Sequence, residues 1–182
     1  MSALPADAAS ARPLHERLRA ADPDAMGEAF RLHAPTLLRV SFALTGSIQE
    51  AEDIVQDLFV GLPEAIGKYD ATGSLDAWLR RVVARMALMR LRAGRRRDAT
   101  AHSATAVDSS TGRPDAVLAD RLTIAQALQA LPDTLRTVVV LKDVEGYSHE
   151  EIARLLGIRP NTAAVRLHRA RTLLRQLLKE DR

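Results

Sequence analysis

The chain has 182 residues, which is enough for one domain or two small ones, and its net charge is only +3. Hydrophobic residues make up 47% and charged residues 27% of the sequence, a balance typical of a folded globular protein. The absence of cysteine excludes disulfides and thiolate metal sites, and the sequence has neither a membrane-length apolar run nor a signal-peptide pattern. We therefore expect a cytoplasmic protein that does not insert into a membrane.

The first part of the chain is expected to be helical, because glycine and proline are sparse inside its apolar segments. Residues 1–22 are predicted to form a flexible N-terminal tail, with a helical turn near Leu14–Leu18. From Asp24 onward, apolar residues recur at near-helical spacing. Pro35 is expected to kink or divide this helix, and Gly46 is expected to end it.

The next predicted helix begins near Ser47 and is acidic on one face. Its apolar residues share one side, and Glu50, Asp53 and Asp57 fall on the opposite side. No Lys or Arg occurs between Thr45 and Glu64. Two interpretations remain open at this point, a solvated acidic face and a docking surface for a basic partner.

A third predicted helix contains the stretch "WLRRVVARMALMRLRAGRRR", residues 78–97, which has eight arginines and no acidic residue. Ser74 can cap this helix. Its apolar side is predicted to comprise Trp78, Leu79, Val82, Met86, Met89 and Ala93. Its basic side is predicted to comprise mainly Arg80, Arg81, Arg85, Arg92 and Arg95. A solvated surface, a membrane-surface helix and a nucleic-acid contact all fit this pattern.

A change of composition separates this block from a second one. From Arg96 to about Asp115 the residues are mainly Ala, Thr, Ser, Asp, Gly and Pro, which predicts a flexible linker. Apolar residues from Ala116 onward predict a helix that Pro132 ends. A further helix is predicted from Asp133 to Glu145, although its "TVVVL" run also has strand propensity.

The C-terminal segment "SHEEIARLLGIRPNTAAVRLHRAR", residues 148–171, has the layout of a helix-turn-helix. Ser148 and Glu151 match a capping box at the start of the first helix. Gly157 suits the left-handed conformation that ends a helix, and Pro160 suits the first position of the next one.

The second helix of this motif is predicted to have one packed side and one basic side. The packed stripe comprises Ala163, Leu167, Ala170, Leu174 and Leu177. Between Glu151 and Glu180 the sequence has six arginines and Lys179 but no acidic residue. This pattern predicts a recognition helix in the major groove of DNA, and the alternative is an ordinary helical hairpin with a basic surface.

The stretch "LPDTLRTVVVLKDVEGYSHEEIARLLGIRPNTAAVRLHRARTLLRQLL" resembles region 4 of an extracytoplasmic-function (ECF, group 4) sigma factor of the bacterial sigma-70 family. Upstream, "AEDIVQDLFVGL" is similar to region 2.2 of that family, and the Arg-rich stretch occupies the place of regions 2.3 and 2.4. The resemblance implies an all-α fold with two small helical domains and a flexible linker. Region 2 would span residues 23–97, the linker 98–115, and region 4, with its helix-turn-helix, 116–182.

The resemblance also implies a function, namely to bind bacterial core RNA polymerase, direct it to promoter DNA and promote DNA opening. The residues implied to dock the polymerase are Asp53, Gln56, Asp57 and Phe59. Those implied to face the −10 element are Arg80, Arg81, Arg85, Met89, Arg92, Arg95, Arg96 and Arg97. Those implied to read the −35 element are Asn161, Thr162, Ala164, Val165, Arg166, His168, Arg169 and Arg171. An anti-sigma factor is a further partner that the resemblance suggests.

The sequence departs from the family pattern in both candidate DNA-binding helices. Arg85 and Met89 stand where the family usually has Asn and Asp, and Ala164 and Val165 stand at base-reading positions that are usually polar. Ala and Val can contact a thymine methyl group but cannot donate a hydrogen bond. Arg159 replaces the usual capping Ser before the recognition helix. We expect an unusual promoter preference.

Three other functions compete with that of a sigma factor. A decoy that binds polymerase but opens promoters poorly is motivated by Arg85 and Met89. A repressor or activator that works without polymerase would leave the first block unexplained. An enzyme is disfavoured because the neighbouring Ser148, His149 and Glu150 diverge on a helix and cannot form a triad. The histidines are also scattered, so no metal, cofactor or small-molecule substrate is expected.

Overall fold

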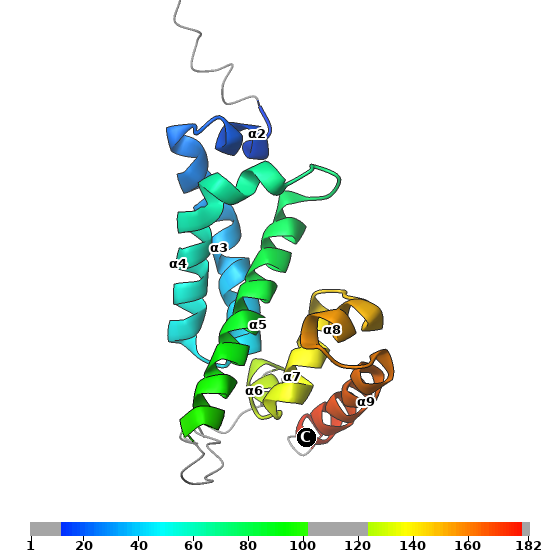
Figure 1. Cartoon of the computed structure of the whole chain (residues 1–182). Coiled ribbons are helices and arrows are strands. Elements are labelled where there is room, and N and C mark those ends of the chain that lie inside the picture. Colours follow the sequence, from blue (N-terminus) through cyan, green and yellow to red (C-terminus); the bar gives the residue numbers. More distant parts are fainter. Residues whose placement is uncertain (1–11, 102–123, 180–182) are drawn as a thin grey trace, which may run out of the picture. The chain divides into compact units, whose positions relative to one another are not determined.

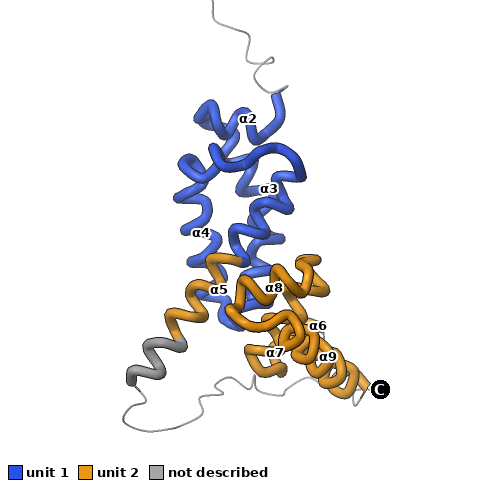
Figure 2. Tube along the Cα trace, turned by 45° about the vertical axis from the view of Figure 1, so that its right-hand side comes forward, with its two compact units in different colours: residues 1–84 blue, residues 85–182 orange. Residues whose placement is uncertain are grey.

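The computed structural model describes residues 12–101 and 124–179, apart from the side chains of residues 95–101. Every regular element in these residues is helical, which confirms the predicted all-α fold (Figure 1). The chain divides into two compact units, residues 1–84 and 85–182, and the division falls within one helix, α5 (Figure 2).

The first unit begins with a short helix, α2 (Leu14–Arg19), which packs against α3 (Pro23–Thr45). Leu18 is buried, and the guanidinium of Arg17 pairs with the carboxylates of Asp22, at 2.7 Å, and Glu28. This pairing holds the pKa of the Asp22 carboxyl below its usual value. Residues 12–22 therefore belong to the packed unit, which differs from the flexible tail predicted for residues 1–22. A single buried Leu and a doubly paired Arg are too few to form a recognisable pattern in the sequence.

Helix α3 runs without interruption through Pro35, so the expected division of this helix is wrong. The Pro35 side chain is exposed, while Ala34 and Leu37 beside it are buried. Packing of this apolar face against α4 offsets the hydrogen bond that a proline removes from a helix interior. The predicted end is confirmed, because Gly46 adopts a left-handed conformation with φ 75°.

Helix α4 (Ile48–Ala65) lies antiparallel to α3 and is followed by a short 3-10 turn, η1 (Ile66–Lys68). The predicted start is confirmed, since the Glu50 N–H donates a hydrogen bond to Ser47 Oγ at 3.3 Å. The core of this unit is aliphatic, and its fully buried side chains include Leu37, Leu44, Ile54 and Leu62.

Helix α5 (Leu75–Ala101) carries the Arg-rich stretch and is capped by Ser74, whose Oγ accepts from the Ala77 N–H at 3.1 Å. Its buried line differs from the predicted apolar side. The buried residues are Leu79, Val83, Ala84, Ala87 and Leu88. The predicted Trp78, Val82 and Met86 are half-buried, and Met89 is 58% exposed. The helix also continues to Ala101, beyond the predicted start of the linker, while residues 102–123 lie outside the described chain.

The second unit contains α6 (Ile124–Gln129), α7 (Asp133–Val139), a π-helical turn η2 (Val140–Val144), α8 (His149–Leu156) and α9 (Pro160–Leu177). The "TVVVL" run is helical, which confirms the predicted helix despite the strand propensity of these residues. Arg136 is 5% exposed and donates from Nη1 to the carbonyl oxygens of Gln129, at 3.4 Å, and Leu131, at 3.3 Å. Its Nη2 also pairs with Asp133 at 2.7 Å, so this arginine fixes the turn between α6 and α7.

Two serines of the first unit should respond oppositely to removal of the hydroxyl. Ser41 is fully buried, and its Oγ has no hydrogen-bond partner among the described residues, so Ser41→Ala should stabilise the unit by about 1 kcal/mol. Ser47→Ala removes the α4 cap and should destabilise it by about 1 kcal/mol. Trp78 is the chain's single tryptophan and belongs to this unit, so its fluorescence during urea unfolding reports both changes. Destabilisation by Ser41→Ala would show that the buried hydroxyl is satisfied.

Candidate nucleic-acid interface

Helices α8 and α9 form the predicted helix-turn-helix, with each expected signal in place. The Glu151 N–H donates to Ser148 Oγ at 3.1 Å, and the Ser148 N–H donates to Glu151 Oε2 at 2.8 Å, which completes the capping box. Gly157 ends α8 with φ 66°, and Pro160 is the first residue of α9. Arg159 provides no side-chain cap in this part of the structure, in agreement with the expected loss of a cap there.

The buried side of α9 follows the predicted stripe. Ala163, Leu167 and Ala170 are buried, and Leu174 and Leu177 are half-buried. The opposite side is exposed and comprises Asn161, Val165, His168, Arg169 and Thr172. Four of the predicted −35 residues, Asn161, Val165, His168 and Arg169, therefore share one outward surface, which we call the α9 outer face.

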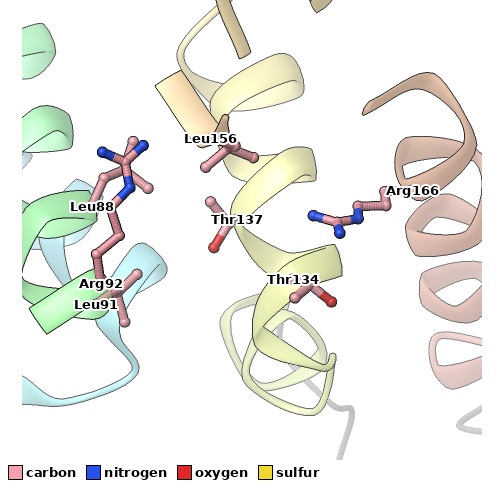
Figure 3. A pocket seen from close by; sticks show the side chains of 7 residues that line it. All are labelled: Leu88, Leu91, Arg92, Thr134, Thr137, Leu156 and Arg166. Atoms are coloured by element: carbon pink, nitrogen blue, oxygen red, sulfur yellow. The ribbon is translucent and has the colours of Figure 1, made fainter. Parts of the chain in front are cut away.

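The other predicted −35 residues occupy the flanks of α9. Thr162 and Ala164 are half-buried. Arg166 is also half-buried, and its side chain extends from α9 toward α7 (Figure 3). Its guanidinium is thus directed along the α7 side of the recognition helix and away from the α9 outer face.

Arg171 has a specific acidic partner within the second unit. Its Nε and Nη2 donate to the two carboxylate oxygens of Asp143, at 3.0 Å and 2.6 Å. This bidentate bond raises the pKa of Arg171. Asp143 lies on the π-helical turn η2, which interrupts the regular register of the preceding helix. Asp143 is not predictable from the sequence, because no pattern in the sequence signals a π turn at this point.

The start of α8 is acidic, in contrast to α9. The backbone N–H of Glu150 and the Ser148 side chain hydrogen-bond the Glu150 carboxylate and lower its pKa. Acidic groups are favoured at a helix N-terminus because of the unpaired N–H groups there. The basic character of the motif therefore comes from α9 and not from α8.

The exposed side of α5 combines arginines with a methionine. Arg81, Arg85 and Arg92 are exposed, and because they recur at helical spacing they share this side with the exposed Met89. Arg80 is half-buried, and its Nε lies 3.0 Å from Asp76 Oδ2. Asp76 also contacts His33 Nδ1 on α3 at 3.2 Å, so Arg80 belongs to a structural cluster. Arg95, Arg96 and Arg97 lie on α5, but their side chains are outside the description.

The predicted polymerase-binding residues of α4 divide between two sides of the helix. Asp53, Gln56 and Asp57 are exposed together, which we call the α4 acidic face. Phe59 is only 9% exposed, and its ring packs edge-on against Phe30 of α3 with a centroid distance of 5.0 Å. Phe30 itself is 50% exposed.

Two other kinds of site are not found in the described residues. No helix there is long and apolar enough to cross a membrane. No group of three or more His, Cys, Asp or Glu side chains within residues 12–101 and 124–179 could hold a metal ion.

An exposed basic face on the second helix of a helix-turn-helix defines the second unit as a DNA-binding module of the transcription-factor type. Two family models match the chain, "Sigma-70 region 2" over residues 29–97 and "Sigma-70, region 4" over residues 121–174. Both exposed charged surfaces of the first block and the helix-turn-helix fall within these matches.

Individual relatives agree with the family models. CarQ, an RNA polymerase sigma factor of Myxococcus xanthus, is 36% identical over 91% of this chain and 95% of its own length. The ECF RNA polymerase sigma factor SigE of Mycolicibacterium smegmatis is 35% identical. The match covers 83% of this chain and 60% of the length of SigE. Among solved structures, the sigma factor RpoE of Bartonella quintana, bound to the anti-sigma factor NepR, matches with a TM-score of 0.58 and 26% identity, over 86% of this chain and 98% of the other.

The chain belongs to the family of ECF RNA polymerase sigma factors. Members of this family direct RNA polymerase to promoters, so this is a sigma factor for transcription initiation.

The turn between α8 and α9 should depend on the left-handed conformation of Gly157. A Cβ at this position would meet no neighbouring atom, so the cost of Gly157→Ala comes from the backbone alone, about 1 kcal/mol. Hydrogen exchange of the α8 and α9 amides should then become about fivefold faster wherever it proceeds through opening of this motif. Gly61→Ala, inside the regular helix α4, is the control and should leave these amides unchanged. Equal exchange in Gly157→Ala and the unmodified chain would contradict the role assigned to this turn.

Proposed function

We propose that the chain is a group 4 sigma factor in which three separate helical surfaces have three jobs. The α4 acidic face binds core polymerase, the exposed side of α5 faces the −10 element, and α9 reads the −35 element. The observation that carries this assignment is the segregation of charge, with acidic residues exposed on α4 and arginines exposed on α5 and α9.

The α4 acidic face fits a basic protein partner better than it fits DNA. Asp53 and Asp57 lie one helical turn apart and are both exposed, with Gln56 beside them. Charged groups at such an interface mainly accelerate association and select the partner. Phe59 lies on the buried side of α4 and packs on Phe30, so its part in this surface is to hold α4 against α3.

The exposed side of α5 fits a DNA strand that is being separated. Arg81, Arg85 and Arg92 can hold phosphates, whereas the exposed thioether of Met89 can contact an unstacked base. Arg80 contributes indirectly, because its contact with Asp76 places it in the cluster that links α5 to His33 on α3.

The α9 outer face fits the major groove. Arg169 and His168 can donate hydrogen bonds to base edges or phosphates, and Val165 and Ala164 can contact thymine methyl groups. Regions 2 and 4 act as one bivalent reader once both are held by the polymerase, so neither needs to bind promoter DNA tightly alone. The limits 23–97 and 116–182 remain part of this proposal, and the two family matches, 29–97 and 121–174, lie inside them.

The partners follow from these surfaces and from the relatives. The chain acts in the cytoplasm, where the polymerase is, and needs no cofactor. An anti-sigma factor is a further proposed partner, because the solved structures of RpoE and of CnrH, the latter with a TM-score of 0.54 and 25% identity, are complexes with NepR and with the cytosolic domain of CnrY.

Run-off transcription with purified core polymerase is the test of the whole proposal. Promoter fragments recovered by the reconstituted holoenzyme from genomic DNA should give transcripts only when this chain is added. Binding to core without any transcript would instead identify a decoy that occupies polymerase.

Reversing charge on the α4 acidic face should abolish binding to core polymerase. The double substitution Asp53→Lys with Asp57→Lys places two positive charges against a basic partner, which should weaken binding at least 100-fold if each reversal costs about 1.5 kcal/mol or more. Co-purification with core and fluorescence titration measure the loss. Glu16→Lys is the control for a charge reversal elsewhere, because Glu16 is exposed on α2 and lies outside the α4 acidic face. Unchanged binding by the double variant would place the polymerase contact elsewhere.

Position 85 should contribute to the choice of −10 sequence. Arg85→Asn replaces a flexible cation with a short amide that can hydrogen-bond a base edge, so the preferred −10 bases should change. Sequencing of transcripts from a randomised −10 library measures this preference for both proteins. Arg81→Asn, one turn earlier on the exposed side, is the control for simple loss of a phosphate contact and should lower activity on all sequences alike. An identical preference and activity for Arg85→Asn would mean that position 85 touches no base.

A further inference from the structure

The ion pair between Asp143 and Arg171 contributes little to the stability of the fold. The two side chains are 34% and 46% exposed, and surface ion pairs of this kind are worth about 0–1 kcal/mol. Its geometry is nevertheless specific, since both carboxylate oxygens are engaged by a planar guanidinium. A well-formed pair that stabilises little needs another explanation.

The position of Arg171 on α9 supplies one. It lies in the second half of the helix, three residues after His168, so the two residues are neighbours on adjacent turns. Residues near the start of a recognition helix contact base edges, and residues further along and on its flanks lie closer to the phosphates. Arg171 is therefore suited to phosphate contact, which contributes to DNA affinity but does not distinguish one base sequence from another.

We propose that Asp143 restrains sequence-independent DNA binding by occupying the guanidinium of Arg171. The inference rests on the proposed −35 role of α9. Asp143 presents two anionic acceptor oxygens to Arg171, as a phosphate would, and a DNA phosphate must displace it to gain the bidentate contact. Asp143 lies on the π turn η2, and its carboxylate meets Arg171 on the flank of α9.

Asp143→Asn is the central test, because it keeps the shape of the side chain and removes its charge. The full-length chain is titrated with a scrambled duplex, labelled with fluorescein, at several salt concentrations. Release of one arginine should steepen the slope of log affinity against log salt by about 1, and should tighten binding about threefold to tenfold at low salt. Asp143→Glu, which retains the charge, should behave as the unmodified chain. Asp24→Asn, at the exposed start of α3, adds the same net charge away from Arg171 and should have a smaller effect.

A double substitution separates the pair from general charge effects. If Asp143 acts through Arg171, then Asp143→Asn should give no gain in a chain that already carries Arg171→Ala. Circular dichroism and hydrogen exchange of α9 identify any variant that is merely unfolded. Unchanged or weaker binding of Asp143→Asn to the scrambled duplex, or the same gain with and without Arg171, would overturn the proposal.

The holoenzyme gives a second reading that distinguishes this inference from the proposed function. Core polymerase with the unmodified chain should retain a selected promoter duplex in the presence of excess scrambled duplex. With the Asp143→Asn variant, the polymerase should lose part of this preference for the selected duplex. If the unmodified chain shows no discrimination, the proposed function fails. If it discriminates and Asp143→Asn equals Asp24→Asn, only the role of Asp143 fails. If Asp143→Asn loses the selected duplex without binding the scrambled one more tightly, Asp143 positions Arg171 for DNA and does not restrain it.

Discussion

Burial of one apolar side of each helix decides which residues of this protein can meet a partner. A fully buried aliphatic side chain contributes about 1.5–3 kcal/mol, more than any exposed ion pair in the structure can contribute. In α4 the burial of Ile54, Leu58 and Leu62 fixes the rotation of the helix. Asp53 and Asp57 are exposed as a consequence of that packing. The same holds in α9, where burial of Ala163 and Leu167 leaves His168 and Arg169 outside.

The arginines of this chain do two different kinds of work, and burial separates them. Arg17 and Arg136 are buried, and their guanidinium groups donate hydrogen bonds to carboxylates or carbonyl oxygens. These bonds link neighbouring helices. Arg85 and Arg169 are exposed and carry their charge to the surface. The planar, permanently charged guanidinium suits both tasks, because it can satisfy several acceptors inside the protein and can also match a phosphate outside. The composition alone, with few lysines and many arginines, therefore overstates the charge that DNA would meet.

Several helix ends were predictable because each of them depends on one or two neighbouring residues. Ser47, Ser148 with Glu151, and Gly157 act through local backbone hydrogen bonds or a left-handed turn, so they can be recognised without knowledge of the fold. The rotation of α5 was not predictable, because its many apolar residues allow several buried lines, and only packing selects the one through Val83 and Ala87. The effect of Pro35 was not predictable for a related reason, because it depends on how much apolar surface the rest of α3 buries. Asp143 could not be found, because its contact with Arg171 joins residues far apart in sequence through a π turn.

Both proposed DNA-binding surfaces carry apolar side chains, at exposed or half-exposed positions, where the sequence resemblance leads us to expect polar ones. Val165 is 44% exposed on the α9 outer face, and Met89 is 58% exposed beside the arginines of α5. An apolar side chain gains from contact with a methyl group or an unstacked base, and it leaves a polar base edge without a partner. Discrimination under the proposed function would then come from which bases the surface rejects as well as from those it binds. Apolar contacts do not weaken sequence-independent binding of phosphates by the flanking arginines. Restraint of that binding therefore matters more for this surface. Under the proposal made above, the carboxylate of Asp143 provides the restraint at Arg171.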